Sequence, residues 1–168
     1  MKKKQSLSAS LEDYIEAIYH IIEEKLVARS KEIAAKLDVS RASVTEALRA
    51  LSKKGLINYA PYEAITLTDK GRKVAEDVIF RHQTLKRFFI EVLALDEDIS
   101  EEGACKVEHA APPEIINRMI NFIDFIQKCP RGGDDLIKGF SDYCAQGKTT
   151  LDCEDCVSKC LDQSKKVG

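Results

Sequence analysis

The sequence predicts a mainly α-helical fold, and three observations support this prediction. Apolar residues recur every three or four positions over most of residues 10–126, which is the spacing of one buried helix face. Capping and breaking residues punctuate these runs, as Gly55 does after one of them. Only one short segment, residues 56–68, carries the turn and alternation signals of a strand pair.

The N-terminal part of the sequence predicts helices followed by a hairpin. The first helix starts near Ser10, which resembles a capping box with Asp13, and Ser30 caps the second. In the second strand, Ile65 and Leu67 alternate with threonines. This order predicts a winged helix-turn-helix, whose second helix of the pair enters the DNA major groove. The helices are expected from about residue 10, over 30–37 and over 41–54, and the strands near 56–59 and 64–68.

The remaining periodic segments predict a helical second domain. A long helix is expected over residues 69–93, a shorter one over 101–109 and a further one from Pro113 to Ile126. This last helix is apolar nearly all round, so it must be covered on more than one side. We therefore expect an all-helical dimerisation domain and a homodimer, with a monomeric core helix as the alternative.

Three segments are expected on this basis. Residues 1–73 form the winged helix-turn-helix DNA-binding domain, residues 74–127 the helical metal-binding and dimerisation domain, and residues 128–168 a short Cys-rich C-terminal tail.

Composition and termini narrow the class of protein. Neither a signal peptide nor an apolar run of membrane-spanning length is visible, so we expect a cytoplasmic protein without a membrane partner. Thiols stay reduced in that compartment, and the six cysteines therefore point to metal or redox chemistry before structural disulfides. Because no nucleophile, general-base pair or phosphate-cradling glycine loop is visible, we expect neither an enzyme nor a small organic substrate.

Charge is distributed unevenly along a chain whose net charge is -2. Residues 1–73 hold 14 basic and 10 acidic side chains, and the remainder holds 12 basic and 18 acidic ones. A mildly basic N-terminal half is compatible with double-stranded DNA as a partner, although solvated helices often show an asymmetry of this size.

Residues with metal-ligating side chains recur at helical spacing. Cys105, Glu108 and His109 fall at i, i+3 and i+4, so a thiolate, a carboxylate and an imidazole share one helix face. The carboxylates of the i, i+3 pair Asp13 and Glu16 do the same on the first helix. Mixed oxygen, nitrogen and sulfur donors suit a first-row divalent ion. Taken singly, Asp13 could simply complete a helix cap and Cys105 could be a small buried hydrophobe.

A further candidate ligand, His82, lies on the apolar seam of the long helix, where it could also be a hydrogen-bonded core histidine. Three segments that contain these candidate ligands together form a specific pattern: Leu-Glu-Asp-Tyr-Ile-Glu-Ala-Ile-Tyr (11–19), Phe-Arg-His (80–82) and Cys-Lys-Val-Glu-His (105–109). They resemble the motifs of the diphtheria toxin repressor and manganese transport regulator family, over about residues 7–126. The resemblance implies a metal-activated transcriptional repressor whose ligands are Asp13, Glu16, His82, Cys105, Glu108 and His109.

The chain departs from both branches of that family. The iron branch usually has a methionine where Asp13 stands, and the manganese branch has a carboxylate where Cys105 stands. The soft thiolate disfavours Mn(II), so we expect Fe(II) ahead of Mn(II). The glutamate of the iron branch's ancillary site is replaced by Lys86, so we do not expect a family-like ancillary site.

The predicted recognition helix offers a polar face to DNA. Serine hydroxyls and helix N-terminal amides suit phosphates, whereas Arg41, Ala42 and Thr45 are better candidates for base edges. Lys53 and Lys54 could contact the DNA backbone, although any solvated helix shows such residues. The expected DNA-binding residues are Ser40, Arg41, Ala42, Ser43, Thr45, Arg49 and the wing residue Tyr62.

The tail could hold a second metal centre. Cys153, Cys156 and Cys160 lie at i, i+3 and i+7, and with Cys129 or Cys144 they could hold Zn(II) or an iron-sulfur cluster. Free thiols or a redox-sensitive disulfide are the alternatives. The tail also defines a rival function, a winged-helix regulator that senses redox state or a cluster there. A metalloenzyme or metal-storage protein is a second rival, because carboxylate and histidine sites also serve catalysis.

Overall fold

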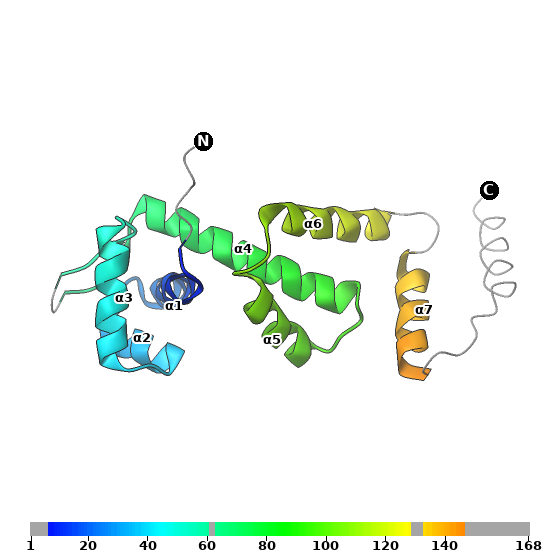
Figure 1. The fold of residues 1–168 in the computed structure, drawn as a ribbon, viewed down its shortest axis with the longest axis horizontal. Coiled ribbons are helices and arrows are strands. Elements are labelled where there is room, and N and C mark those ends of the chain that lie inside the picture. The colour runs from blue at the N-terminus through cyan, green and yellow to red at the C-terminus, as the bar shows by residue number, and fades with distance from the viewer. Residues whose placement is uncertain (1–6, 61–62, 129–132, 147–168) are drawn as a thin grey trace, which may run out of the picture. The chain divides into compact units, whose positions relative to one another are not determined.

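The computed structural model describes residues 7–60, 63–128 and 133–146, and it divides the chain into one unit that ends at Arg81 and another that begins at His82. The predicted mainly helical class is confirmed. The first unit comprises α1 (Ala9–Lys25), α2 (Ser30–Leu37), α3 (Arg41–Lys53), β1 (Ile57–Asn58), β2 (Thr66–Leu67) and the first part of α4 (Asp69–Glu91) (Figure 1). The second unit contains the rest of α4 followed by α5 (Glu97–Val107), α6 (Pro113–Lys128) and α7 (Gly133–Gln146).

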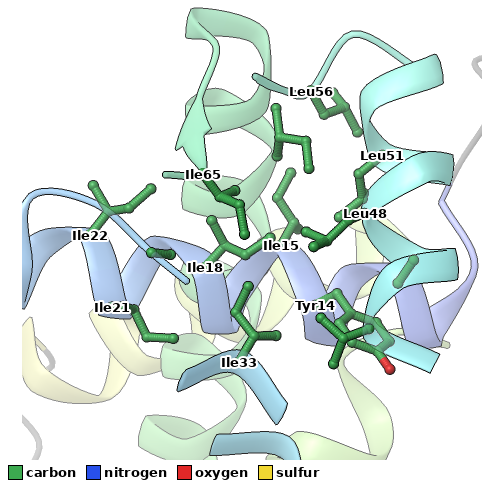
Figure 2. Close-up of a cluster of buried hydrophobic side chains, with 14 of the residues drawn as sticks. Tyr14, Ile15, Ile18, Ile21, Ile22, Ile33, Leu48, Leu51, Leu56 and Ile65 are labelled. Atoms are coloured by element: carbon green, nitrogen blue, oxygen red, sulfur yellow. The ribbon is translucent and has the colours of Figure 1, made fainter. Parts of the chain in front are cut away.

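The three helices and the hairpin of the first unit share one apolar core. Ile15, Ile18 and Leu48 have no exposed surface, and Figure 2 shows them facing one another from α1 and α3. Each fully buried side chain of this size contributes roughly 1.5–3 kcal/mol relative to an exposed one. Because the core joins α1, α2, α3 and the hairpin, these elements are held as one body.

The hairpin is shorter than the sequence predicts. Its antiparallel ladder pairs Ile57 with Leu67 and Asn58 with Thr66. Ile65, which is fully buried, forms a separate bridge with Ala28, ahead of α2. The segment that leads into β2 therefore pairs with the chain between α1 and α2, and β2 itself pairs with β1.

Both predicted serine caps were wrong. Helix α1 begins at Ala9 with Ser8 in the N-cap position, so Ser10 lies inside the first turn and cannot form a capping box with Asp13. Helix α2 has Arg29 at its N-cap, and the Glu32 carboxylate accepts a hydrogen bond from the Arg29 backbone N–H at 3.1 Å. Helix α3 has Ser40 at its N-cap, a cap that was not predicted, and the Ser40 hydroxyl accepts a hydrogen bond from the Ser43 N–H.

Helix α5 begins four residues before the predicted start and ends two residues before the predicted end. Asp96 caps it by accepting a hydrogen bond from the Ile99 N–H, and the acidic residues that follow favour a helix N-terminus. Glu108 follows Val107 with helical dihedral angles, φ −56° and ψ −34°. Cys105 and Glu108 are therefore still related by the i, i+3 geometry of a helix, although α5 ends at Val107.

Helix α7, which follows α6 in the region expected to be a tail, was not predicted. Cys144 lies on α7 and is exposed. The other tail cysteines, Cys129, Cys153, Cys156 and Cys160, lie outside the described residues, as does the wing residue Tyr62. Among the described helices, none has the length and apolar character needed to cross a membrane.

Gly71 in the first turn of α4 makes a close approach that only glycine allows. A Cβ atom at this position would lie 1.8 Å from the backbone oxygen of Leu56, immediately before β1. We expect Gly71→Ala to lower the free energy of unfolding of the first unit by about 2 kcal/mol or more, since backbone must move to relieve the overlap.

Urea denaturation of the full chain measures this effect. Gly139→Ala is the matched control, because nothing lies within 4 Å of a Cβ at Gly139 on α7 and alanine favours a helix. Equal stability of the two variants would contradict the proposed close packing of α4 on the start of the wing.

Candidate metal centre and nucleic-acid interface

His82 on α4 lies between two carboxylates of the second unit. Its Nδ1 atom is 2.7 Å from Oε2 of Glu108, and its Nε2 atom is 3.1 Å from Oε1 of Glu101. The His82 side chain is 15% exposed. The structure thus places the imidazole in a polar site at the edge of the apolar seam, where both ring nitrogens meet carboxylate oxygens.

Glu108 is the most deeply placed of the predicted ligands in the second unit. Its side chain is 1% exposed, and its Oε1 atom lies 3.3 Å from Nε2 of His109. With His82 on the other oxygen, the carboxylate is flanked by two imidazoles. Three of the six predicted ligands, from α4 and from the turn after α5, are therefore brought together in this unit.

The remaining predicted ligands lie on α5 and α1. Cys105 is exposed on α5, one turn before Glu108 and His109. Asp13 and Glu16 are both half-buried on α1 in the first unit, spaced so that they share a face. Glu16 also lies 3.6 Å from Nε2 of His20.

A largely buried ion pair in the first unit was not predicted. Arg81 on α4 lies 3.1 Å from Oε2 of Glu12 on α1, and the two side chains are only 13% and 10% exposed. In the sequence, Arg81 directly precedes His82, and Glu12 directly precedes Asp13. A buried ion pair demands well-defined geometry, so this pair holds the first part of α4 against α1 within the first unit.

Glu101 and Lys86 form a second unpredicted group in contact with His82. Oε2 of Glu101 lies 2.9 Å from the Lys86 ammonium, which is also 3.0 Å from Oε1 of Glu97. The hydrogen bond from Lys86 holds the pKa of Glu101 below its ordinary value, and Glu101 raises the pKa of Lys86. Sequence reasoning missed Glu101 because nothing in its spacing indicates that α4 and α5 bring it to His82.

The grouped side chains fit a divalent metal ion chemically. A buried carboxylate is costly unless opposite charge or hydrogen bonds compensate it, and two imidazoles flank Glu108. Carboxylate oxygen and imidazole nitrogen together are ligands of first-row divalent ions. His82, Glu108 and His109 therefore have the donor chemistry that such an ion needs, and the six-ligand metal centre stays a prediction.

The outer face of α3 carries the predicted DNA-binding residues. Arg41, Ala42, Ser43 and Arg49 are exposed, while the opposite face of the helix is buried in the core. The hydroxyl of Thr45 donates to the Arg41 backbone oxygen at 2.9 Å. The Thr45 hydroxyl is therefore already hydrogen-bonded within the helix, and the Thr45 side chain is half-buried.

A groove of about 670 Å³ runs beside this face. It adds Arg29 and Lys31 from the start of α2 to the predicted Arg41 and Arg49, and among the described lining residues Glu63 is the one carboxylate. A concave surface with four cations suits phosphate groups. Sequence reasoning missed Arg29 and Lys31 because only the packing of α2 beside α3 and the wing brings them to this face.

An apolar groove of about 590 Å³ lies on the second unit between α4 and α6. Ile115, Phe122 and Phe125 of α6 are 46%, 43% and 63% exposed, whereas Ile116, Ile123 and Ile126 are buried. The helix thus covers one apolar face inside its own unit and leaves another at the surface. The groove is lined by Phe88, Pro112, Glu114, Ile115, Arg118, Met119 and Phe122.

The chain combines a winged helix-turn-helix unit with a helical unit that holds a carboxylate and imidazole cluster. This combination is typical of metal-responsive DNA-binding proteins. Two family models match the chain: the iron dependent repressor N-terminal DNA binding domain over residues 6–65, and the iron dependent repressor metal binding and dimerisation domain over residues 68–136. The chain belongs to the diphtheria toxin repressor and manganese transport regulator family of metal-dependent transcriptional repressors.

Individual relatives agree with this assignment. An uncharacterized HTH-type transcriptional regulator of Methanocaldococcus jannaschii is 40% identical over 119 residues, which cover 70% of this chain and 95% of the relative. The HTH-type transcriptional regulator MntR of Oceanobacillus iheyensis is 35% identical over 129 residues, covering 77% and 87% of the two chains.

A solved structure of a manganese-dependent transcriptional repressor in complex with manganese matches with a TM-score of 0.63 and 29% identity. The match covers 72% of this chain but only 56% of that one, so the chain spans little more than half the length of the solved protein.

Proposed function

We propose that the protein is a cytoplasmic repressor that binds operator DNA as a homodimer when a divalent metal ion is bound. The observation that carries the proposal is the buried Glu108 carboxylate between His82 and His109, in a chain that also has a winged helix. The proposed ligands are Asp13, Glu16, His82, Cys105, Glu108 and His109.

Regulation would depend on ligands from both units. Asp13 and Glu16 belong to the DNA-binding unit, and the other four ligands belong to the unit that carries the exposed α6 face. A bound divalent ion supplies the positive charge and coordination bonds that draw such groups together. Joint ligation would then fix the orientation of α3 in each protomer. The metal-free chain would be in equilibrium between a state with variable α3 orientation and an ordered state. To shift that equilibrium from 1:99 to 99:1, the ion must prefer the ordered state by about 5.5 kcal/mol.

The dimer would form through the exposed side of α6. Its apolar residues border a groove, and the family model over this region is that of a metal binding and dimerisation domain. Two-fold symmetry would present two copies of α3 to successive major grooves, which are about 34 Å apart or a multiple of that distance. The arginine-rich groove beside α3 would contact the phosphates that flank each half-site.

We propose Fe(II) as the activating ion ahead of Mn(II). Cys105 supplies a soft donor that Mn(II) disfavours, while the carboxylates suit either ion. One solved relative is a manganese-dependent repressor in complex with manganese, which makes Mn(II) the essential comparison.

Gel shifts with DNA from the gene's own promoter test the proposal. We expect tight binding with Fe(II) under anaerobic conditions, weaker or equal binding with Mn(II), and at least a 100-fold loss when a chelator removes the metal. A shift that is independent of metal, or no shift at all, would contradict the proposal. The Cys153→Ser/Cys156→Ser double variant should respond to metal normally, and loss of its response would favour sensing through the tail.

A further inference from the structure

Glu101 joins the candidate metal centre although no motif includes it. Its Oε1 atom contacts Nε2 of His82 at 3.1 Å, and its Oε2 atom contacts the Lys86 ammonium at 2.9 Å. Lys86 lies one helical turn after His82 on α4. The carboxylate is thus held from two positions of the same helix, and it faces only one of the two imidazole nitrogens.

The two sides of the His82 ring differ in what they offer a cation. Nδ1 faces Glu108, which is 1% exposed and which also meets His109. Nε2 faces Glu101, whose side chain is 54% exposed and which shares the Lys86 ammonium with Glu97. An ammonium so close repels a second cation on the Nε2 side, whereas ligand groups converge on the Nδ1 side.

We propose that Glu101 is a positioning residue that selects Nδ1 of His82 as the metal-binding nitrogen. Glu101 accepts the Nε2–H hydrogen bond and so fixes both the ring orientation and the tautomer, as carboxylates do for metal-binding histidines elsewhere. A divalent ion on this side would be held by Nδ1 of His82 together with Glu108 and His109, while Nε2 would keep its proton in the hydrogen bond to Glu101. Lys86 holds Glu101 in place. This inference rests on the proposed metal centre.

Histidine NMR of the zinc-loaded full chain tests the choice of nitrogen. With 15N-labelled histidine, long-range proton–nitrogen spectra distinguish a metal-bound nitrogen from a protonated one, and the chain has only three histidines to assign. We expect His82 to bind Zn(II) through Nδ1 and to keep its proton on Nε2. Binding through Nε2 would overturn this inference alone, whereas spectra unchanged by Zn(II) would overturn the proposed metal centre with it.

Variants of Glu101 test its positioning role separately. We expect Glu101→Ala to weaken Mn(II) affinity by about 10–100-fold, the range found for groups that orient metal-binding histidines. Glu101→Gln keeps an oxygen that can accept the Nε2–H bond, and it should recover most of that affinity. Glu102→Ala is the matched control, because Glu102 is exposed on the same helix and pairs with Lys106.

Competition with a metal-binding dye measures the affinities, and circular dichroism of the metal-free variants checks that all melt alike. The role of Glu101 is overturned if Glu101→Ala binds Mn(II) like Glu102→Ala. It is also overturned if Glu101→Gln is as weak as Glu101→Ala, since the accepted hydrogen bond would then have no effect.

Discussion

Glu108→Gln is expected to abolish metal-dependent DNA binding while leaving the metal-free fold intact. The substitution conserves size and removes the charge of a carboxylate that is 1% exposed and lies between His82 and His109. Replacing residues that merely orient ligands typically costs 10–100-fold in metal affinity, so loss of a central ligand should cost at least about 100-fold. The metal-free fold should persist, because a neutral amide is cheaper to bury than an ion.

Fluorescence anisotropy of labelled promoter DNA, titrated with Fe(II) and Mn(II), measures this loss. Glu102→Gln makes the same chemical change at an exposed site on α5 and should behave as wild type. If Glu108→Gln retained the metal response of the control, the carboxylate would be structural, and the metal centre would have to lie elsewhere.

The Arg41→Ala/Arg49→Ala double variant is expected to lose about 100-fold in DNA affinity with no change in metal affinity. Both arginines are exposed on α3 and line the cationic groove. Loss of an arginine contact to DNA costs roughly 1–3 kcal/mol when it reads a base, and each lost phosphate contact lowers the salt slope by about one. Measuring the dissociation constant at several salt concentrations, on promoter and unrelated DNA, separates the two kinds of contact.

A change of the same charge in the other unit provides the control. Lys106→Ala/Lys128→Ala removes two exposed cations from α5 and α6, where no DNA contact is proposed. This variant should bind DNA as wild type does. Equal losses in the two double variants would show that net charge, and not the α3 surface, determines affinity.

The sequence predicted those parts of the fold that depend on periodicity. Val78 and Leu85 recur on one face of α4, and both are fully buried in the structure. Helix ends were less predictable, since several residues near each end can satisfy the same backbone groups. Ser30 is a favourable cap by type, yet Glu32 binds the backbone N–H of Arg29 and shifts the cap by one residue.

The candidate site, like the fold, could be predicted only where it depends on spacing along one segment. Spacing along one segment was enough to relate Cys105 to Glu108, because Glu108 keeps helical dihedral angles after α5 has ended. Contacts between segments were not predictable by spacing: Glu101 reaches His82 only because α5 packs beside α4, and Arg81 reaches Glu12 only because α4 packs beside α1. Such contacts depend on tertiary packing, which carries no signature in a local pattern.

The claim that one ion is held by side chains of both units can be tested most directly by a crystal structure of the Mn(II)-loaded chain with anomalous scattering. The account predicts an anomalous peak whose ligands include Glu108 from the second unit and Asp13 from the first. A peak ligated by residues of the second unit alone, or no bound manganese at all, would contradict it.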